Sequence, residues 1–204
     1  MLGFYNYTVY LTYVGLVSAM TGVFFSFAGK LKMAVICLLI SGACDMFDGK
    51  IARTKKDRTE DEKRFGIQID SLCDIVCFGV LPAVISFPVG ATSALQVVIA
   101  ALFTVCGVIR LAYFNVTEEV RQTSTTENRK LYSGMPITST AIIVPLTVYF
   151  SKFLGNAFPT VYTAVLAVCG ILFITPISIK KPGKAGTLIL TIFGVAVLVL
   201  LLSL

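Results

Sequence analysis

The stretch FGIQIDSLCDIVCFG, residues 65–79, is apolar enough to lie in a membrane, yet it contains two carboxylates. Asp70 and Asp74 are one helical turn apart, and Gly66 extends the same helix face by a further turn. An unpaired carboxylate at bilayer depth has a large free-energy cost. Two such residues on one face of a membrane helix therefore indicate a functional site.

The composition of the whole chain agrees with a membrane location. Of the 204 residues, 56% are hydrophobic and only 14% are charged, which predicts an all-α integral membrane protein and excludes an ordinary soluble domain. Apolar runs of about 20 residues predict spanning helices. We expect them near residues 7–28, 31–52, 66–88, 92–116, 134–153, 157–176 and 185–203. We treat residues 1–204 as a single polytopic membrane domain.

The basic residues predict the orientation of the chain. With the N-terminus in the cytoplasm, all Lys and Arg except Lys30, Lys32 and Lys152 fall on the cytoplasmic side. The apolar-free link RTKKDRTEDEKR, residues 53–64, is then an exposed cytoplasmic link. The net charge of +6 is concentrated in such loops, where it faces anionic lipid, so we expect membrane lipid and no nucleic acid as a partner.

A second acidic pair directly precedes this link. In CDMFDGKIAR, residues 44–53, Asp45 and Asp48 share one helix face. The two helices that flank the link should bring all four carboxylates together, and these would repel one another unless a cation joined them. The chain has no histidine, so all-oxygen ligation by Mg²⁺, Mn²⁺ or Ca²⁺ is expected. Four carboxylates can hold two such ions, an arrangement that suits phosphoryl transfer.

Small residues lie beside the acids on the same faces. Gly49, Ala52 and Gly66 leave room for a ligand against the backbone, although small residues also permit close packing of membrane helices. The six cysteines all fall in apolar segments, which predicts buried packing rather than disulfides or a zinc site.

DMFDGKIAR followed by GIQIDSLCD matches the pattern DxxDGxxAR…GxxxDxxxD, and in this the chain resembles the CDP-alcohol phosphotransferase family. The resemblance implies a six-helix membrane core, here about residues 7–176, with residues 185–203 as an additional C-terminal transmembrane helix. It also implies a homodimer in the cell (plasma) membrane. Such a protein is expected to be an enzyme of phospholipid biosynthesis that transfers a phosphatidyl-type group from a CDP-linked lipid to an alcohol and releases CMP.

Three further stretches resemble the phosphatidylserine synthase branch of this family: DSLCDIVCFGVLPA (70–83), IRLAYFNV (109–116) and YSGMP (132–136). They imply L-serine as acceptor and CDP-diacylglycerol or a CDP-linked ether lipid as donor. A glycerol phosphate or inositol phosphate acceptor is the alternative. Such an acceptor adds a dianion that needs several cations, and only Arg110 is well placed among the fourth to sixth helices.

The resemblance also implies roles for the motif positions. Metal ligands are expected at Asp45, Asp48, Asp70 and Asp74, with Asp74 also the catalytic base at the cytoplasmic face of the membrane. The cytidine and diphosphate are expected to border Gly49, Ala52, Arg53 and Gly66. Arg110 is expected to bind a phosphate or the carboxylate of serine, with an interfacial arginine that reaches the lipid headgroups as the alternative.

The link departs from the family pattern, because the twelve residues between Arg53 and Gly66 are more than is usual. A longer cytoplasmic link and an altered outline of the nucleotide site are therefore expected. A divalent-cation transporter is a competing interpretation of acids in membrane helices. It predicts acids spread through the bilayer on broken helices, whereas here the four acids flank one link.

Overall fold

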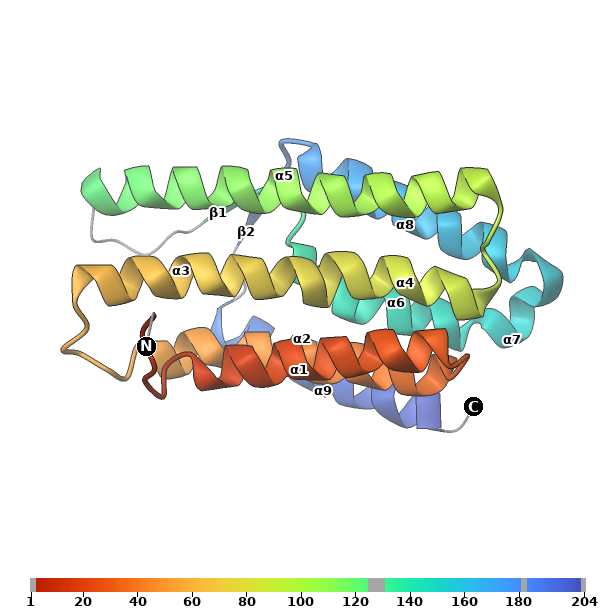
Figure 1. The fold of residues 1–204 in the computed structure, drawn as a ribbon, viewed down its shortest axis with the longest axis horizontal. Helices are drawn as coiled ribbons and strands as arrows, with labels where there is room; N and C mark the ends of the chain where they lie inside the picture. The colour runs from red at the N-terminus through yellow and green to blue at the C-terminus, as the bar shows by residue number, and fades with distance from the viewer. Residues whose placement is uncertain (1–2, 125–130, 181–182, 203–204) are drawn as a thin grey trace.

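The computed structural model describes residues 3–124, 131–180 and 183–202 as a bundle of long helices that run side by side (Figure 1). The helix α3 continues without a break through the π-helical segment η1 into α4. This composite helix lies between the α1–α2 pair and α5. The elements of this half are α1 (Tyr10–Phe27), α2 (Leu31–Ala52), α3 (Glu60–Asp74), η1 (Ile75–Val80), α4 (Leu81–Val89) and α5 (Ala94–Ser124).

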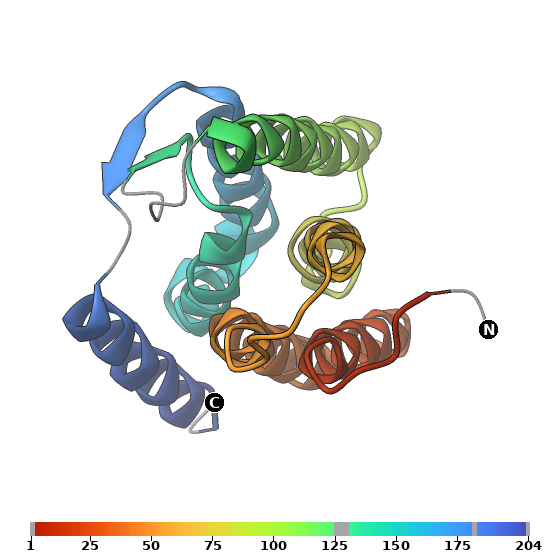
Figure 2. The ribbon, with the colours of Figure 1, turned by 90° about the vertical axis from the view of Figure 1, so that its left-hand side faces the viewer.

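The second half of the chain covers the side of the bundle behind these helices. Viewed end-on, α9 lies on the outside, next to α2 and α6 (Figure 2). The elements are β1 (Leu131–Ser133), η2 (Ile137–Ser139), α6 (Thr140–Tyr149), α7 (Ser151–Leu154), η3 (Gly155–Ala157), α8 (Phe158–Ile174), β2 (Ser178–Lys180) and α9 (Lys184–Leu202).

Four helical segments are long and apolar enough to cross a membrane: Tyr10–Phe27, Glu60–Val89, Ala94–Arg121 and Ser151–Ile174. Two shorter apolar helices, Ile137–Tyr149 and Thr191–Leu202, accompany them. The 22-residue helix α2 also has the length of a span, but Asp45 and Asp48 make it more polar. The prediction of an all-α, multi-pass membrane protein is confirmed.

The predicted start of the third helix at residue 66 was wrong. Helix α3 begins at Glu60, because Thr59 forms a capping box with Glu62. The backbone N–H of Glu62 donates to Thr59 Oγ1 over 3.2 Å, and Thr59 N–H donates to Glu62 Oε2 over 2.8 Å. Residues 60–64 are thus the first helical turns and not part of the link. Helix α5 likewise continues to Ser124, past the expected end at 116.

Helices α1, α2 and α4 pack closely through small residues. A Cβ on Gly22 of α1 would lie 2.9 Å from Cys37 Cβ of α2 and 3.0 Å from Leu81 Cδ2 of α4, so a larger residue would force these helices apart. Leu81 and its neighbour Phe78 are fully buried. Five of the six cysteines are buried and all six are free thiols, as expected.

Polar side chains hold the composite helix just beyond Asp74. Pro82 has no N–H to donate to a preceding carbonyl, and the Thr140 hydroxyl of α6 donates to Phe78 O over 3.1 Å. The Tyr162 hydroxyl of α8 donates to Pro82 O over 2.7 Å. The π-helical turn after Asp74 is therefore fixed from two neighbouring helices, and such turns are frequent at functional sites.

A short antiparallel ladder was not predicted. Strand β1 pairs with β2, so that Leu131 lies opposite Lys180. Gly134 follows directly with φ +79°, and a Cβ there would lie 2.6 Å from Phe173 O, so glycine is required at this close approach. The ladder joins the end of α8 to the segment that leads into η2.

Candidate active site

The structure brings three of the four predicted acids together. Carboxylate oxygens of Asp45 on α2 and of Asp70 and Asp74 on α3 all lie within 4.8 Å of one another, in partly buried positions. The spacing follows from the sequence, because Asp70 and Asp74 share one face of α3. Three oxygens at this separation are suitably placed to ligate one metal ion.

Asp48 joins this cluster through Asp70. It is only 7% exposed, its carboxylate accepts a hydrogen bond from Thr12 Oγ1 of α1 over 3.0 Å, and it interacts with the carboxyl group of Asp70. Asp45 is in the same relation to Asp74. The four carboxylates therefore form one continuous group between α2 and α3, which we call the acid cluster.

Arg110 of α5 is a buried cation that interacts with the acid cluster. It is 9% exposed, and its charge acts on both Asp45 and Asp74. Its Nε donates to Met135 O over 3.1 Å, and its guanidinium lies 5.5 Å from the ring centre of Phe114. These contacts hold the Arg110 side chain in the bundle interior, on the side of α5 that lines the cavity described below.

Four carboxylates beside one buried arginine still form an acidic site. The donor set consists of carboxylate oxygens, without histidine, and this fits hard divalent ions such as Mg²⁺, Mn²⁺ or Ca²⁺. The residues present therefore fit a divalent metal, as expected from the sequence.

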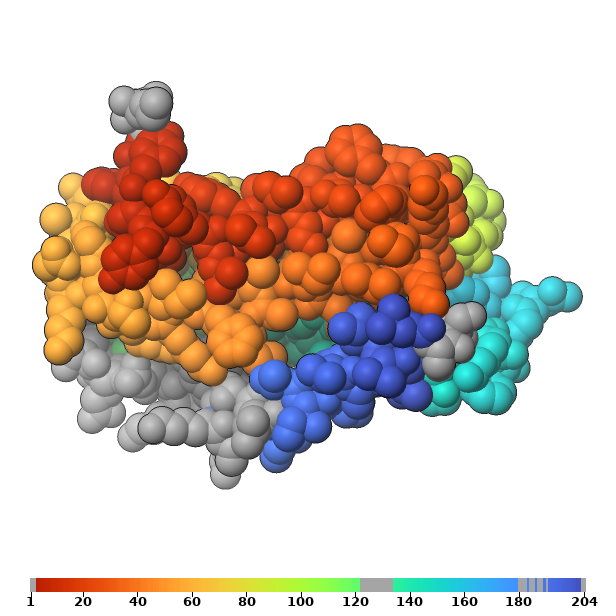
Figure 3. Space-filling model, turned by 90° about the horizontal axis from the view of Figure 1, so that it is seen from below, coloured from red at the N-terminus to blue at the C-terminus, as the bar shows by residue number. Residues whose placement is uncertain are grey.

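A cavity of about 740 Å³ opens from the acid cluster between α2, α3, α5, η2 and α9. Its polar end includes the acid cluster, Arg53 and Arg110. Its other walls are largely apolar. They include Ile36, Leu39, Ile142, Val195 and Leu198. We call this the apolar cavity. Figure 3 shows α9 beside α2 on this side of the molecule, and Thr191 of α9 donates to Met46 Sδ over 3.2 Å.

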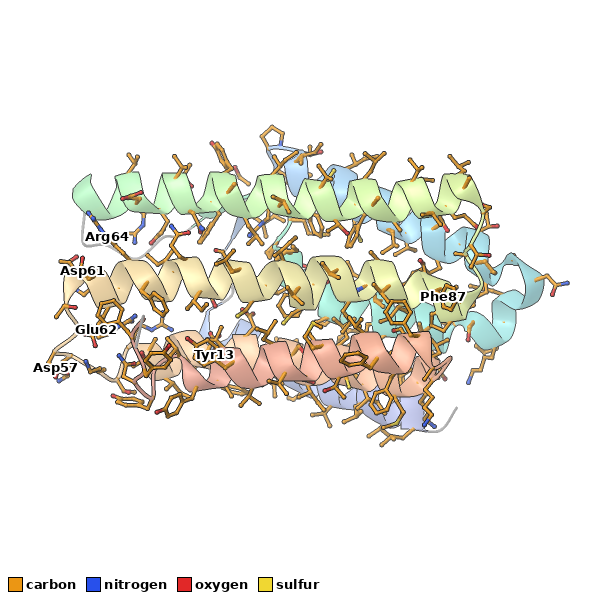
Figure 4. The ribbon with its side chains drawn as sticks, viewed as in Figure 1. Tyr13, Asp57, Asp61, Glu62, Arg64 and Phe87 are labelled. Atoms are coloured by element: carbon orange, nitrogen blue, oxygen red, sulfur yellow. The ribbon has the colours of Figure 1, made fainter. Side chains whose placement is uncertain are left out.

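A second cavity of about 530 Å³ lies towards the link between α2 and α3, and we call it the cationic cavity. Its lining includes Arg53, Arg58, Lys63 and Arg121, together with the three small motif residues Gly49, Ala52 and Gly66. Asp48, Gly49, Arg53 and Asp70 line both cavities. The two cavities therefore meet at the acid cluster. Figure 4 places Asp57, Asp61 and Glu62 of this region at the end of the bundle far from Phe87.

The two motif glycines have different surroundings. A Cβ on Gly49 would meet no atom within 4 Å, so this face of α2 is open to a ligand. A Cβ on Gly66 would lie only 2.5 Å from Arg58 Nη2. The space above Gly66 is thus taken by a side chain of the link, which sequence reasoning did not foresee.

Sequence reasoning also missed Thr12 and a polar bridge between α3 and α5. Ser71 Oγ donates to Asn115 Oδ1 over 2.8 Å, and Asn115 Nδ2 donates to Gln68 Oε1 over 3.3 Å. The bridge ties α5 to α3 beside Asp70. The pattern IRLAYFNV included Asn115 without indicating its contact. Thr12 had no signal beyond being a polar residue in an apolar helix.

The fold and the site define a polytopic helical membrane protein with a carboxylate cluster between an apolar and a cationic cavity. Residues 5–176 match the sequence model of the CDP-alcohol phosphatidyltransferase family, and the chain belongs to this family. The match ends before α9 begins.

Curated relatives have related names. A CDP-diacylglycerol–serine O-phosphatidyltransferase of Saccharomyces cerevisiae is 35% identical over 59% of this chain and 44% of its own length. One of Helicobacter pylori is 30% identical over 78% of this chain and 65% of its own. An archaetidylserine synthase of Methanothermobacter thermautotrophicus is 30% identical over 76% of this chain and 63% of its own length. The chain thus spans about half to two thirds of the length of these relatives.

Proposed function

We propose that this protein transfers a phosphatidyl group from CDP-diacylglycerol, or from a CDP-linked ether lipid, to L-serine and releases CMP. The observation that supports this most strongly is the junction of the two cavities at the acid cluster. A CDP-linked lipid has a polar anionic nucleotide at one end and apolar chains at the other. We therefore assign the nucleotide to the cationic cavity and the chains to the apolar cavity, with the diphosphate beside the four acids.

We assign Asp45, Asp48, Asp70 and Asp74 as metal ligands. We expect them to bind two divalent ions, Mg²⁺ or Mn²⁺. Ca²⁺ is the alternative, because it also prefers oxygen ligands. Divalent ions bound there supply charge neutralisation and Lewis-acid polarisation of the diphosphate oxygens. Arg53, which lines both cavities, and the open backbone face at Gly49 border the place assigned to the diphosphate.

In the reaction, the serine hydroxyl oxygen forms a bond to the lipid-side phosphorus of the diphosphate. The bond from that phosphorus to the oxygen of CMP breaks, and CMP leaves. The proton of the hydroxyl moves to the carboxylate of Asp74, which is the catalytic base in addition to its contact with metal. Arg110, held by Met135 O, binds either a phosphate or the serine carboxylate at the same end of the apolar cavity.

Charge alone does not choose the acceptor, because Lys50 and Arg53 line the apolar cavity in addition to Arg110. The choice of serine over glycerol phosphate or inositol phosphate is supported by the names of the relatives, which act on serine in both the phosphatidyl and the archaetidyl series. Those two series also leave the donor chains open between ester and ether lipids.

We place the site at the cytoplasmic face of the cell membrane. The link with its many basic residues lies at one end of the bundle. The α1–α2 connection with Lys30, the first turn of α2 with Lys32, and α7 with Lys152 lie at the other end (Figure 1). A homodimer is proposed from the family resemblance alone.

The function is tested with purified protein, CDP-diacylglycerol, and L-serine, glycerol 3-phosphate or inositol phosphate in parallel, with CMP release as the readout. Serine-dependent release that a chelator abolishes and Mn²⁺ or Mg²⁺ restores supports the proposal. CMP release with glycerol 3-phosphate or inositol phosphate but not with serine would assign the chain to another branch of the family. Mg²⁺ flux into liposomes without CDP-lipid, and no CMP release, would favour a transporter.

A further inference from the structure

Arg58 occupies a defined position in the link between α2 and α3. Its Nη1 donates to Ala52 O, the last residue of α2, over 3.5 Å, and its Nη2 donates to Glu62 O in the first turn of α3 over 3.1 Å. Nη2 also lies against the backbone of Gly66. The longer link is thus folded back, so that a guanidinium covers one of the small motif residues.

The hydrogen bonds of Arg58 are incomplete. Among the residues that the structure describes, Nε of Arg58 is a buried side-chain nitrogen with no hydrogen-bond partner. A buried donor without an acceptor is destabilising and calls for a specific explanation. The two carbonyl contacts leave the position of the guanidinium well defined while one of its donors stays unused.

Arg58 also differs from Lys63 and Arg121 in charge pairing. In the cationic cavity, Lys63 forms an ion pair with Glu60 at 2.7 Å, and Arg121 forms an ion pair with Glu118 at 2.6 Å. Within the described part of the chain, the partners of Arg58 are carbonyl oxygens, and no carboxylate neutralises it. Its full charge is therefore available to an anion in this cavity.

We propose that Arg58 binds a phosphate of the cytidine nucleotide from the side opposite the acid cluster. This inference rests on the proposed function and names a residue outside the family pattern. Asp48 and Asp70 line the same cavity as Arg58, so a diphosphate bound in this cavity faces both acids and this arginine. A side chain at position 66 would displace this guanidinium.

A purely structural role, in which Arg58 only joins α2 to α3, predicts a different result. An arginine that contacts a phosphate contributes to binding of CMP but not to binding of cytidine, which has no phosphate. A structural arginine supports the shape of the whole cavity, so its loss weakens binding of both ligands. The ratio of the two dissociation constants separates the two roles.

The test uses the full chain purified in detergent with Mn²⁺ and compares Arg58→Gln with Arg64→Gln. Arg64 is an exposed residue of α3 that lines neither cavity and lies at the same end of the bundle (Figure 4). We expect Arg58→Gln to weaken CMP binding roughly ten-fold or more with little change for cytidine, and Arg64→Gln to change neither. Unchanged CMP binding, or equal weakening of both ligands, would overturn the proposal.

Two further variants complete the test. If Arg58→Gln does not yield folded protein, Arg58→Lys keeps a charge but not the planar fork, and it should weaken CMP binding more than cytidine binding. Gly66→Ala should weaken CMP binding in the wild-type background and add little in an Arg58→Ala background. Equal effects of Gly66→Ala in both backgrounds would contradict a role for Gly66 in positioning the Arg58 guanidinium.

A wild-type protein that binds no CMP would refute the proposed function itself, and the role of Arg58 with it.

Discussion

Thr12 and Asp48 join α1 to the acid cluster through a buried hydrogen bond of 3.0 Å between Thr12 Oγ1 and Asp48 Oδ2. Helix α1 contributes no residue to the family pattern, yet its hydroxyl fixes the orientation of one predicted metal ligand. The buried position makes this contact important, because an ionised carboxylate that is only 7% exposed needs hydrogen-bond donors around it.

The first prediction concerns this contact. Thr12→Val removes the donor at nearly constant shape, and loss of an outer-shell partner of a metal ligand lowers metal affinity by about 10- to 100-fold. We expect the Mn²⁺ concentration for half-maximal CMP release to rise accordingly. Thr21→Val on the same helix is the control, because Thr21 is exposed and its hydroxyl bonds Val17 O of its own helix. Equal metal requirements in both variants would show that Thr12 does not support the site.

The second prediction separates the roles of Asp70 and Asp74. Asp74→Asn removes the proposed base and one of the four proposed metal ligands, so turnover should fall by roughly 100-fold or more, while Mn²⁺-dependent binding of CMP is weakened but not lost. Asp70→Asn removes a ligand of the cluster and should lose both turnover and Mn²⁺-dependent binding of CMP. Near-normal turnover in Asp74→Asn, together with inactive Asp70→Asn, would refute the assignment of the base.

The third prediction tests Arg110. Arg110→Lys loses the bond from Nε to Met135 O and the fixed planar fork, so a substrate anion is held less well. The KM for one substrate should rise by roughly ten-fold. A rise for serine assigns Arg110 to the serine carboxylate, and a rise for CDP-diacylglycerol assigns it to a phosphate. Lys152→Gln on the exposed helix α7 is the control. No change in either KM would exclude a role in binding.

The sequence predicted the helical segments and the acidic faces because both depend on local patterns. Hydropathy over about 20 residues identifies a span, and acids three or four residues apart share a helix face. The convergence of Asp45 with Asp74 followed from the single hydrophilic link that joins their helices. The ladder between Leu131 and Lys180 could not be predicted in this way, because it pairs short segments far apart in the chain.

Two other differences have separate causes. The sequence Thr59–Glu62 reads TEDE and contains the capping-box pattern, so the early start of α3 was available locally and was hidden by the strongly charged composition of the link. The contact of Arg58 with Gly66 had no local signal. It depends on how the link folds back over α3, and basic residues in such a link are ordinarily exposed.

The fourth prediction concerns the start of α3. Thr59→Ala removes the cap and should destabilise the protein by about 0.5–2 kcal/mol, whereas Thr59→Ser keeps the hydroxyl and should behave like the wild type. Thermal unfolding in detergent measures the difference. Indistinguishable unfolding of the alanine and serine variants would mean that the capping box does not define this helix end.

The central claim is that carboxylates from α2 and α3 together hold divalent ions beside the diphosphate. An anomalous density map of the protein with Mn²⁺ and CDP tests it most directly. We predict manganese bound between the two helices, with Asp45 or Asp48 and Asp70 or Asp74 as ligands of the same ion. Manganese bound by one helix alone, or four carboxylates that point to separate places with no shared ion, would contradict the account.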